Sequence, residues 1–320
     1  MSASRRLRTT RVAAVMVASS LFAAGHAQAT YPGSNNGRLA FGMNVGGNTD
    51  IYSVLPNGND LRRLTHDPRF DACASYSPDG KRIAFCRAAP GGFEIWTMKD
   101  NGTHEAQLTH LGSGAQFPDY APDGRTITFD AGPTGPVREI YVIGADGTGL
   151  TRLTNTSGFN AYPAYSPDGR RIAFISDRSG LAQVWVMNAD GSDPAQLTFD
   201  PARKDQLPDW SPDGTRIAYQ SHATGGGDIY LTDVDGSNQI RLTSDPALDF
   251  APAWSPDGTQ IAFVSNRLSP RSVFVMNADG TNPRPVRPGP GPQFAPGWQP
   301  RGARRGARLG PCLGMVSRCW

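Results

Sequence analysis

The chain has 320 residues, of which 37 are glycine, 27 are proline and only 18% are charged. This low charge content excludes a chain that is disordered by charge excess, and the many glycines and prolines predict many turns. The net charge of +3 comes from the two ends, because between residues 30 and 300 there are 22 Lys and Arg against 28 Asp and Glu. A mildly acidic body argues against a nucleic-acid-binding surface.

The first 29 residues have the layout of a cleaved signal peptide. Basic residues from Arg5 to Arg11 precede the apolar stretch Val12–Ala24, and the small-x-small sequence Ala27-Gln28-Ala29 follows. The apolar stretch is too short to span a bilayer comfortably but suits a signal that is cut after Ala29. We therefore expect an exported protein, periplasmic or secreted, with no membrane span after cleavage. The alternative is an uncleaved anchor.

A Ser-Pro-Asp-Gly or Ala-Pro-Asp-Gly motif recurs at intervals of 44 or 45 residues. Proline presets φ for the second position of a turn, aspartate tolerates the third, and glycine accepts a positive φ at the fourth. A short β-branched and aromatic run follows each copy, so each motif is expected to join two antiparallel strands. The copies are Ser77–Gly80, Ala121–Gly124, Ser166–Gly169, Ser211–Gly214 and Ser255–Gly258.

A second pattern runs through the same repeat six times. An aliphatic–aromatic pair is followed by an Asn-Gly or Asp-Gly turn and then by another aliphatic residue, which predicts a second hairpin in every unit. Two hairpins in about 44 residues give four strands, the size of one propeller blade. The six pairs are Ile51-Tyr52, Ile95-Trp96, Ile140-Tyr141, Val184-Trp185, Ile229-Tyr230 and Val273-Phe274.

The two ends of the repeat array complement each other. Gly37–Phe41 matches the second strand of a unit whose first strand is missing, and Phe294–Pro300 matches Phe250–Pro256 of the preceding repeat. Residues 293–298 are therefore expected to complete the blade that residues 38–65 begin, which removes a free sheet edge. The predicted fold is an all-β, six-bladed propeller over residues 30–300, with four antiparallel strands per blade and no helix of useful length after the signal peptide.

The units resemble the WD40-like Pro-Asp repeats of TolB-type propellers. The copy at Asp249–Gly280 is the best match, and the resemblance covers residues 38–300. About eight residues separate the expected cleavage site from the first strand, so we expect the propeller part alone, without the N-terminal domain of complete TolB proteins. The resemblance implies a non-enzymatic module that binds a protein or peptide in the bacterial cell envelope or medium.

The inner strand of each blade is expected to line a central channel with two rings of side chains. The first ring stands five residues before the aromatic residue that precedes each turn motif: Asp71, Ala115, Asn160, Asp205, Asp249 and Gln293. The second ring stands one residue before that aromatic residue: Ser75, Asp119, Ala164, Asp209, Ala253 and Gly297. We predict that the polar members of these rings bind a peptide, a sugar or a cation at a channel mouth. The alternative is that they only meet channel water.

The other recognisable signals give little chemistry. The aspartates of the Pro-Asp-Gly turns recur because the turn needs them. No histidine lies at ligand spacing to another histidine or a cysteine, and the sequence has neither a Gly-x-Ser-x-Gly elbow nor a phosphate-binding loop. We expect no metal and no cofactor. A polysaccharide lyase or hydrolase that uses channel-mouth carboxylates remains the alternative function, but the rings contain no histidine, which favours binding over catalysis.

The four cysteines fall into two pairs, as suits an exported chain. Cys73 and Cys86 flank the first turn motif symmetrically, so they face each other and form a disulfide candidate if the hairpin has no bulge. Their alternative role is that of two small buried core residues. Cys312 and Cys319 lie in the basic tail, residues 301–320, which breaks the repeat and which we expect to be disordered. We expect a monomer.

Overall fold

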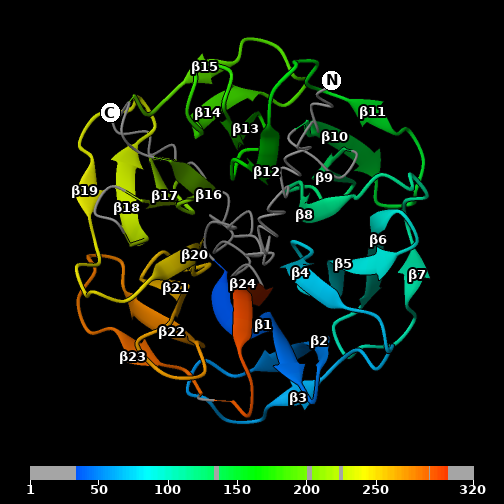
Figure 1. Cartoon of the computed structure of the whole chain (residues 1–320), viewed down its shortest axis with the longest axis vertical. Coiled ribbons are helices and arrows are strands. Elements are labelled where there is room, and N and C mark those ends of the chain that lie inside the picture. Colours follow the sequence, from blue (N-terminus) through cyan, green and yellow to red (C-terminus); the bar gives the residue numbers. More distant parts are fainter. Residues whose placement is uncertain (1–33, 133–136, 200–203, 223–225, 288, 302–320) are drawn as a thin grey trace, which may run out of the picture.

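Six sheets stand around a central axis in the computed structural model, which describes residues 34–132, 137–199, 204–222, 226–287 and 289–301 (Figure 1). Each sheet has four antiparallel strands, so the predicted six-bladed propeller is confirmed. No helix occurs in the ranges just given. The predicted signal peptide, Cys312, Cys319 and all of the predicted tail except Arg301 lie outside the described residues.

The first three blades hold the N-terminal half of the repeat array. Blade 1 contains β24 (Gln293–Arg301), β1 (Asn35–Val45), β2 (Asn48–Val54) and β3 (Arg62–Arg63). Blade 2 contains β4 (Asp71–Tyr76), β5 (Arg82–Ala89), β6 (Gly92–Lys99) and β7 (Ala106–Gln107). Blade 3 contains β8 (Gln116–Tyr120), β9 (Thr126–Ala131), β10 (Glu139–Gly144) and β11 (Thr151–Arg152).

The remaining blades follow in chain order around the ring. Blade 4 contains β12 (Asn160–Tyr165), β13 (Arg171–Ser176), β14 (Gln183–Asn188) and β15 (Ala195–Gln196). Blade 5 contains β16 (Asp205–Trp210), β17 (Arg216–Ser221), β18 (Asp228–Asp233) and β19 (Ile240–Arg241). Blade 6 contains β20 (Asp249–Trp254), β21 (Gln260–Ser265), β22 (Ser272–Asn277) and β23 (Arg284–Pro285).

The ring is closed by the last strand. β24, orange-red in Figure 1, lies beside the blue β1 and pairs with it antiparallel, with Leu39 opposite Trp298. The backbone N–H of Arg38 also donates to Oε1 of Gln299, at 3.2 Å. The first blade is thus built from both ends of the repeat array, as the sequence predicts, and its inner edge is covered.

The Pro-Asp-Gly motif forms the turn that its residues predict. In blade 2, Oδ1 of Asp79 accepts from the Ser77 hydroxyl at 2.7 Å and from the backbone N–H of Lys81 at 3.0 Å. Gly80 has a φ of 69°, which favours glycine. A Cβ on Gly80 would also stand 2.2 Å from the carbonyl oxygen of Pro300 in blade 1. The glycine therefore serves the turn and the close contact between blades together.

A buried threonine ties the outer strand of a blade to its neighbour. In blade 2, the Thr109 hydroxyl accepts from the backbone N–H of Ile95 at 2.8 Å and donates to Glu94 at 2.5 Å. The same arrangement recurs in blade 1, where Thr65 accepts from the backbone N–H of Ile51 at 2.9 Å. This network explains why a Leu-Thr pair recurs at the end of the repeat: the hydroxyl satisfies a buried backbone donor beside a short outer strand.

Every inner strand contains a β-bulge at the same position of the repeat. The residue at the bulge has a positive φ in all six blades, and in five of them a proline follows it. Because proline lacks an N–H, it fits where the strand ladder is interrupted. The six bulge residues are Cys73, Phe117, Tyr162, Leu207, Ala251 and Ala295.

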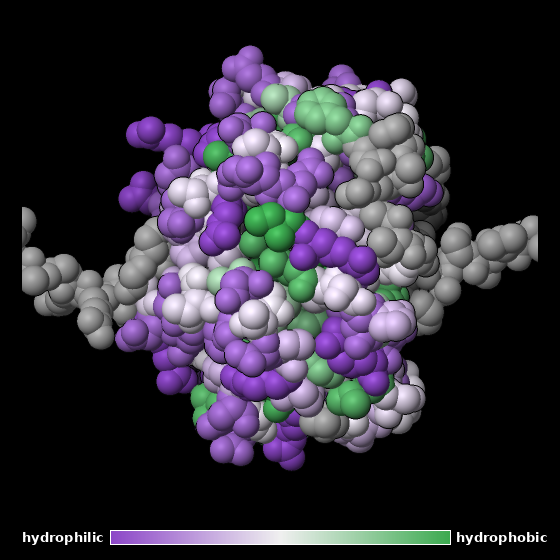
Figure 2. Space-filling view, turned by 90° about the vertical axis from the view of Figure 1, so that its left-hand side faces the viewer, coloured by the Kyte–Doolittle hydropathy of each residue, from purple (hydrophilic) through white to green (hydrophobic). Residues whose placement is uncertain are grey.

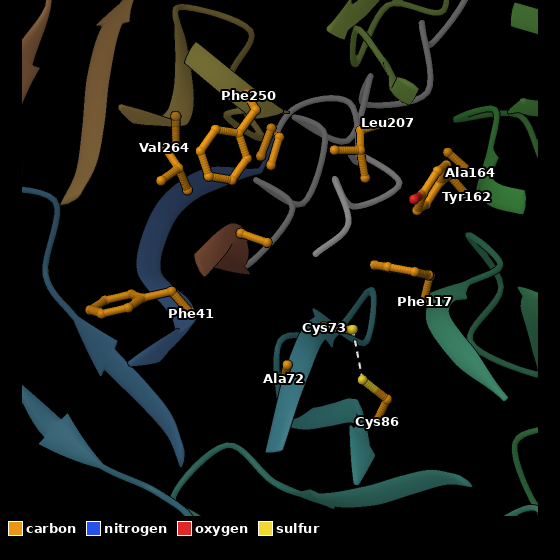
Figure 3. Close-up of a cluster of buried hydrophobic side chains, with 14 of the residues drawn as sticks. Phe41, Ala72, Cys73, Cys86, Phe117, Tyr162, Ala164, Leu207, Phe250 and Val264 are labelled. Atoms are coloured by element: carbon orange, nitrogen blue, oxygen red, sulfur yellow. Dashed lines mark hydrogen bonds between the residues drawn. The ribbon is translucent and has the colours of Figure 1, made fainter. Parts of the chain in front are cut away.

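The bulges supply side chains to the apolar centre of the ring. Figure 3 shows Phe117, Tyr162 and Leu207 directed toward that centre. Phe117 and Tyr162 meet edge to face with ring centroids 4.6 Å apart, a favoured aromatic arrangement. All six bulge residues are buried and belong to the largest hydrophobic cluster of the described residues.

The side of the ring seen in Figure 2 is mostly hydrophilic, with small hydrophobic patches between polar side chains. Phe199 and Ile240 are the most exposed of the large hydrophobic side chains that the structure describes. Isolated apolar side chains of this kind are ordinary on protein surfaces. Within the described ranges, no helix is long and apolar enough to cross a membrane.

Candidate functional site

The polar side chains of the first predicted ring are buried. Asp71, Asn160, Asp205, Asp249 and Gln293 each open an inner strand, at the end of the strand away from the Pro-Asp-Gly turn. All five are at most 1% exposed. The structure therefore places them together at one end of the ring, but inside the packed wall.

Asp71 holds a buried arginine. Its two carboxylate oxygens accept from Nε and Nη2 of Arg87, each at 2.7 Å, and Nη1 of Arg87 reaches Glu105 at 2.6 Å. The Arg87 guanidinium also lies over the Trp96 ring, 4.7 Å from its centroid. Burial raises the pKa of Asp71, although the arginine beside it acts in the opposite direction. The carboxylate thus anchors β5 to β4 through a bidentate ion pair.

Asn160 and Asp249 also hold an arginine of their own blade, whereas Gln293 contacts the backbone of the neighbouring blade. Nη2 of Arg267 contacts Asp249 at 2.7 Å, and Nη2 of Arg178 donates to Oδ1 of Asn160 at 2.9 Å. Oε1 of Gln293 accepts from the backbone N–H of Val273 at 2.7 Å. Asp205 lies opposite Ser221 in the strand ladder. Ligand binding by this ring stays a prediction.

The carboxylates of the second ring link adjacent blades. Oδ2 of Asp119 accepts from the backbone N–H of Tyr165 at 2.8 Å, and Oδ2 of Asp209 accepts from the backbone N–H of Trp254 at 2.6 Å. Both carboxylates are fully buried. Burial raises the pKa of Asp209 well above its ordinary value, and the negative charge of Asp119 adds to the effect. Ligand binding by Asp119 and Asp209 also stays a prediction.

The bulge in blade 2 changes how the two cysteines meet. Ala72, not Cys73, lies opposite Cys86 in the ladder, so the bulge-free hairpin that direct opposition required is absent. Cys73 nevertheless has a φ of 58°, which turns its side chain toward Cys86. The two sulfur atoms lie 2.6 Å apart, as thiols in this structure (Figure 3). The bulge therefore creates the contact that we expected it to prevent.

Sequence reasoning missed the surface formed by the turns. The Pro-Asp-Gly turns and the Asn-Gly or Asp-Gly turns of the outer hairpins lie on one face. The backbone N–H that opens each outer-hairpin turn donates to the carbonyl of the residue after a Pro-Asp-Gly glycine, as from Ala189 to Arg170 at 2.9 Å. We call this surface the Pro-Asp face. Its five Pro-Asp-Gly aspartates are exposed: Asp79, Asp123, Asp168, Asp213 and Asp257.

Grooves separate neighbouring blades on the Pro-Asp face. Four of them, between blades 2 and 3, 3 and 4, 4 and 5, and 5 and 6, have volumes between about 250 and 680 Å³. Each is lined by a proline and an aspartate from the turn motif, and three also contain an arginine of the following strand: Arg82, Arg171 and Arg216.

Arginines in the grooves lie over aromatic rings of the next blade. The Arg171 guanidinium is 4.8 Å from the centroid of Trp210, and that of Arg216 is 5.5 Å from Trp254. Such a groove offers a cation and a carboxylate to a side chain of an extended peptide, whereas Trp210 and Trp254 are at most 1% exposed. The sequence signal that could have revealed it is the aromatic residue before each turn motif together with the basic residue five positions after the motif's first residue.

No group of three His, Cys, Asp or Glu side chains that could hold a metal ion occurs among the described residues.

Family comparisons identify the repeat. Residues 202–305 match the family model of the TolB beta propeller domain, and residues 137–226 match that of the Tricorn protease N-terminal beta propeller domain. The chain is a six-bladed β-propeller that is similar to TolB propellers. No curated protein matches this TolB-like propeller in a sequence search.

Solved structures share the fold of the TolB-like propeller. TolB from Acinetobacter baumannii is 22% identical, with 85% of this chain and 68% of that chain covered and a TM-score of 0.75. A putative TolB from Agrobacterium tumefaciens is 21% identical, with 82% and 91% covered and a TM-score of 0.65. An oligogalacturonate lyase from Vibrio parahaemolyticus is 15% identical, with 82% and 78% covered and a TM-score of 0.55. At these identities the likeness is one of fold.

Proposed function

We propose that this TolB-like propeller is an exported, non-enzymatic, monomeric module that binds a protein or peptide of the bacterial cell envelope or medium through its Pro-Asp face. The fold supports an interaction module in general, since TolB structures share it. The basic and apolar composition of residues 1–29 supports export.

The repeated grooves of the Pro-Asp face carry this proposal. At least four shallow grooves of similar make-up lie side by side between consecutive blades. A row of like grooves suits an extended peptide or a broad protein surface, which contacts several of them at once. A small substrate would instead need one site at which its reacting bond meets catalytic groups.

The buried carboxylates support binding over polysaccharide cleavage. Asp71 is paired with Arg87 of the adjacent strand β5, and Asp249 with Arg267, two residues after β21. Asp119 and Asp209 accept backbone hydrogen bonds from the next blade. Glycoside cleavage by a carboxylate pair requires two carboxyl groups that face one bond of the substrate. Here the carboxylates face their own protein partners.

The proposal is tested by capture from envelope extract with the full chain as bait. Two matched double variants are captured beside the wild type: Asp123→Arg with Asp168→Arg on the Pro-Asp face, and Asp205→Ala with Asp249→Ala at the opposite end of the inner strands. We expect one dominant partner that binds the wild type and the second variant but not the first.

Other outcomes of this experiment reject the proposal in different ways. Loss of the partner only in the Asp205→Ala, Asp249→Ala variant would move the binding surface to the predicted channel mouth. If no partner were captured and the wild type released unsaturated sugars from a uronate polymer, the binding function would be rejected in favour of a polysaccharide lyase. A circular dichroism spectrum of each bait is the control that tests whether both variants are folded.

A further inference from the structure

One groove of the Pro-Asp face differs from the other three. It lies between blades 3 and 4, which are neighbours in the ring (Figure 1). Its volume of about 680 Å³ is the largest of the four. Ala121, Val142 and Ala189 contribute apolar side chains to its wall. The groove therefore has room for a large side chain of another molecule.

The equivalent grooves each hold an arginine of the propeller itself. The residue five positions after the first residue of the turn motif is Arg82 in blade 2, Arg171 in blade 4 and Arg216 in blade 5. The guanidinium groups of Arg171 and Arg216 lie over a buried tryptophan of the next blade, 4.8 and 5.5 Å from the ring centroids. Arg82 donates to the Thr97 hydroxyl at 2.8 Å. The repeat itself thus shows that such a groove accommodates a guanidinium group.

Blade 3 lacks this arginine. Thr126 stands at its position, and Val142 stands where blade 2 has Thr97. The Thr126 side chain is too short to extend across the groove, and its hydroxyl meets that of Tyr165, the buried aromatic residue of blade 4, at 3.5 Å. The place of the guanidinium group is therefore open in this groove, although the turn residues around it follow the repeat.

The charge of this groove is negative. Asp123, Asp168 and Asp190 line it, and the described lining residues include no Lys or Arg. All three aspartates are exposed. Arg125 and Arg170 follow the two Pro-Asp-Gly turns, but they are not among the residues that line the groove. A cationic side chain would therefore meet carboxylates at the edge of an apolar space.

The turns hold these carboxylates in ionised form. Hydrogen bonds from Ser166 and Ser192 lower the pKa of Asp168 and Asp190, respectively. In both turns, and in that of Asp123, Oδ1 accepts the backbone hydrogen bond of the turn. The turn therefore fixes each carboxylate in place through one of its two oxygen atoms.

We propose that the groove between blades 3 and 4 takes an arginine side chain from an extended segment of the partner, in the place that Arg171 and Arg216 occupy in their own grooves. This inference rests on the proposed function, because it names the group that the Pro-Asp face recognises. The apolar stem of the arginine packs against Val142, and its guanidinium group pairs with Asp123 or Asp168. Arginine suits the groove better than lysine because its planar head pairs with a carboxylate through two N–H groups.

An NMR titration of the full chain with labelled valine methyl groups tests this assignment. The probe is a synthetic peptide with one arginine between alanine and serine residues, and the comparison peptide carries citrulline, which lacks the charge, in its place. We expect the Val142 signals to shift saturably with the arginine peptide, and the citrulline peptide to bind about tenfold more weakly. Val186, at the equivalent position of blade 4, should not respond.

Two matched variants place an arginine at the same position of the repeat. Thr126→Arg restores the missing arginine of blade 3 and fills the groove, so the response of Val142 should be lost. Gln260→Arg adds the same charge at the equivalent position of blade 6 and should titrate as the wild type does. The other methyl signals show in the same spectra whether each variant is folded.

A third variant removes the charge without filling the groove. Asp123→Asn/Asp168→Asn keeps the Oδ1 acceptors that the turns use, and it should bind the arginine peptide about tenfold more weakly than the wild type does. The proposal would be overturned if Val142 did not respond in the wild type, if it responded equally in Thr126→Arg, or if the arginine and citrulline peptides bound equally well.

Failure of this inference can be distinguished from failure of the proposed function, because the titration needs no captured partner. If the titration failed but the Asp123→Arg/Asp168→Arg bait lost its partner, the proposed function would stand and arginine recognition would be rejected. If the titration succeeded but that bait kept its partner, the groove would bind arginine and the proposed function would be rejected.

Discussion

Buried carboxylates in this propeller accept hydrogen bonds from backbone N–H groups and arginine side chains of the propeller itself. Asp209 shows this at the scale of a single residue, since one of its oxygens accepts from the backbone N–H of Trp254 while the other, Oδ1, has no hydrogen-bond partner. A charge with so few partners is poorly compensated when it is removed from water. Asp209 therefore links two blades, and the free-energy cost of burying it depends on whether its carboxylate is ionised.

The pH dependence of stability tests the state of Asp209. Burial raises its pKa in the folded protein, so between the unfolded and the folded pKa the native state holds the extra proton and stability falls as pH rises. We expect Asp209→Asn, which cannot ionise, to gain stability relative to the wild type as pH increases through this window. Urea unfolding of both proteins from pH 4 to 8 measures the difference.

Asp146→Asn is the matched control for this titration. Asp146 is exposed, and hydrogen bonds from Thr148 lower its pKa. Its ionised form is favoured in the native state, so its contribution is present above the unfolded pKa and is lost as pH falls. The two variants should thus show slopes of opposite sign. If the difference in unfolding free energy between Asp209→Asn and the wild type did not change with pH, burial would not perturb the pKa of the Asp209 carboxylate.

The cysteine pair of blade 2 leads to a second prediction at this scale. We predict a disulfide between Cys73 and Cys86 under oxidising conditions, since the two sulfur atoms lie 2.6 Å apart. For a loop of this length the bridge should stabilise the fold by about 3 kcal/mol. Burial raises the pKa of the Cys86 thiol, which slows alkylation in the folded state, so thiols are counted under denaturing conditions.

Peptide mapping after alkylation gives the answer for this pair. Cys73 and Cys86 should be alkylated only after reduction, and Cys73→Ser should lower the free energy of unfolding in non-reducing buffer but not in reducing buffer. Alkylation of both residues without a reductant would contradict the disulfide and leave them as buried core residues.

At the scale of elements, the closing strand should depend on its tryptophan. Trp298 packs in blade 1 with 1% of its surface exposed, and its indole donates to Ala253 of blade 6. Trp298→Phe removes this donor from the Ala253 carbonyl. We expect it to cost about 0.5–1.5 kcal/mol more than Trp254→Phe, because the indole N–H of Trp254 has no partner to lose.

Denaturant unfolding of the two tryptophan variants measures this difference. Both substitutions remove a similar volume from equivalent positions of the repeat, so the cavity cost is matched. Equal losses of stability would show that the hydrogen bond between blades 1 and 6 contributes nothing measurable to closure.

The elements that the sequence could predict are those set by local chemistry. Proline, aspartate and glycine specify the turns, and the turns specify the order of the strands, which is why the blades and the closing strand could be anticipated. The bulges were missed, although a proline follows Phe117, Tyr162 and Leu207 in strands that otherwise alternate regularly. Proline inside an inner strand is the signal that should have indicated them.

The candidate site was less predictable because it depends on contacts between blades. Arg87 lies in the second strand of blade 2 and Arg267 lies two residues after the second strand of blade 6. They stand 16 and 18 residues after the ring carboxylates that they hold, and periodicity alone does not reveal such pairing. The grooves of the Pro-Asp face join residues of successive repeats, such as Arg216 and Trp254, which are 38 positions apart. Only the closed ring brings them together.

At the scale of the whole molecule, the propeller presents two different ends. One end carries buried ring residues that hold the strands together, and the other carries exposed aspartates, prolines and grooves. A rigid ring with a repeated, charged surface provides binding groups without a need for moving parts. We propose that the Pro-Asp face is the end that recognises a partner.

Hydrogen exchange of the full chain, alone and with the captured partner, tests this claim most directly. We expect slower exchange on binding in the Pro-Asp-Gly turns and the adjacent outer-hairpin turns of consecutive blades, because a partner that covers the Pro-Asp face restricts their exposed backbone. Slower exchange confined to the opposite end, around Asp71, Asn160 and Asp249, would contradict the account and return the site to the predicted channel mouth.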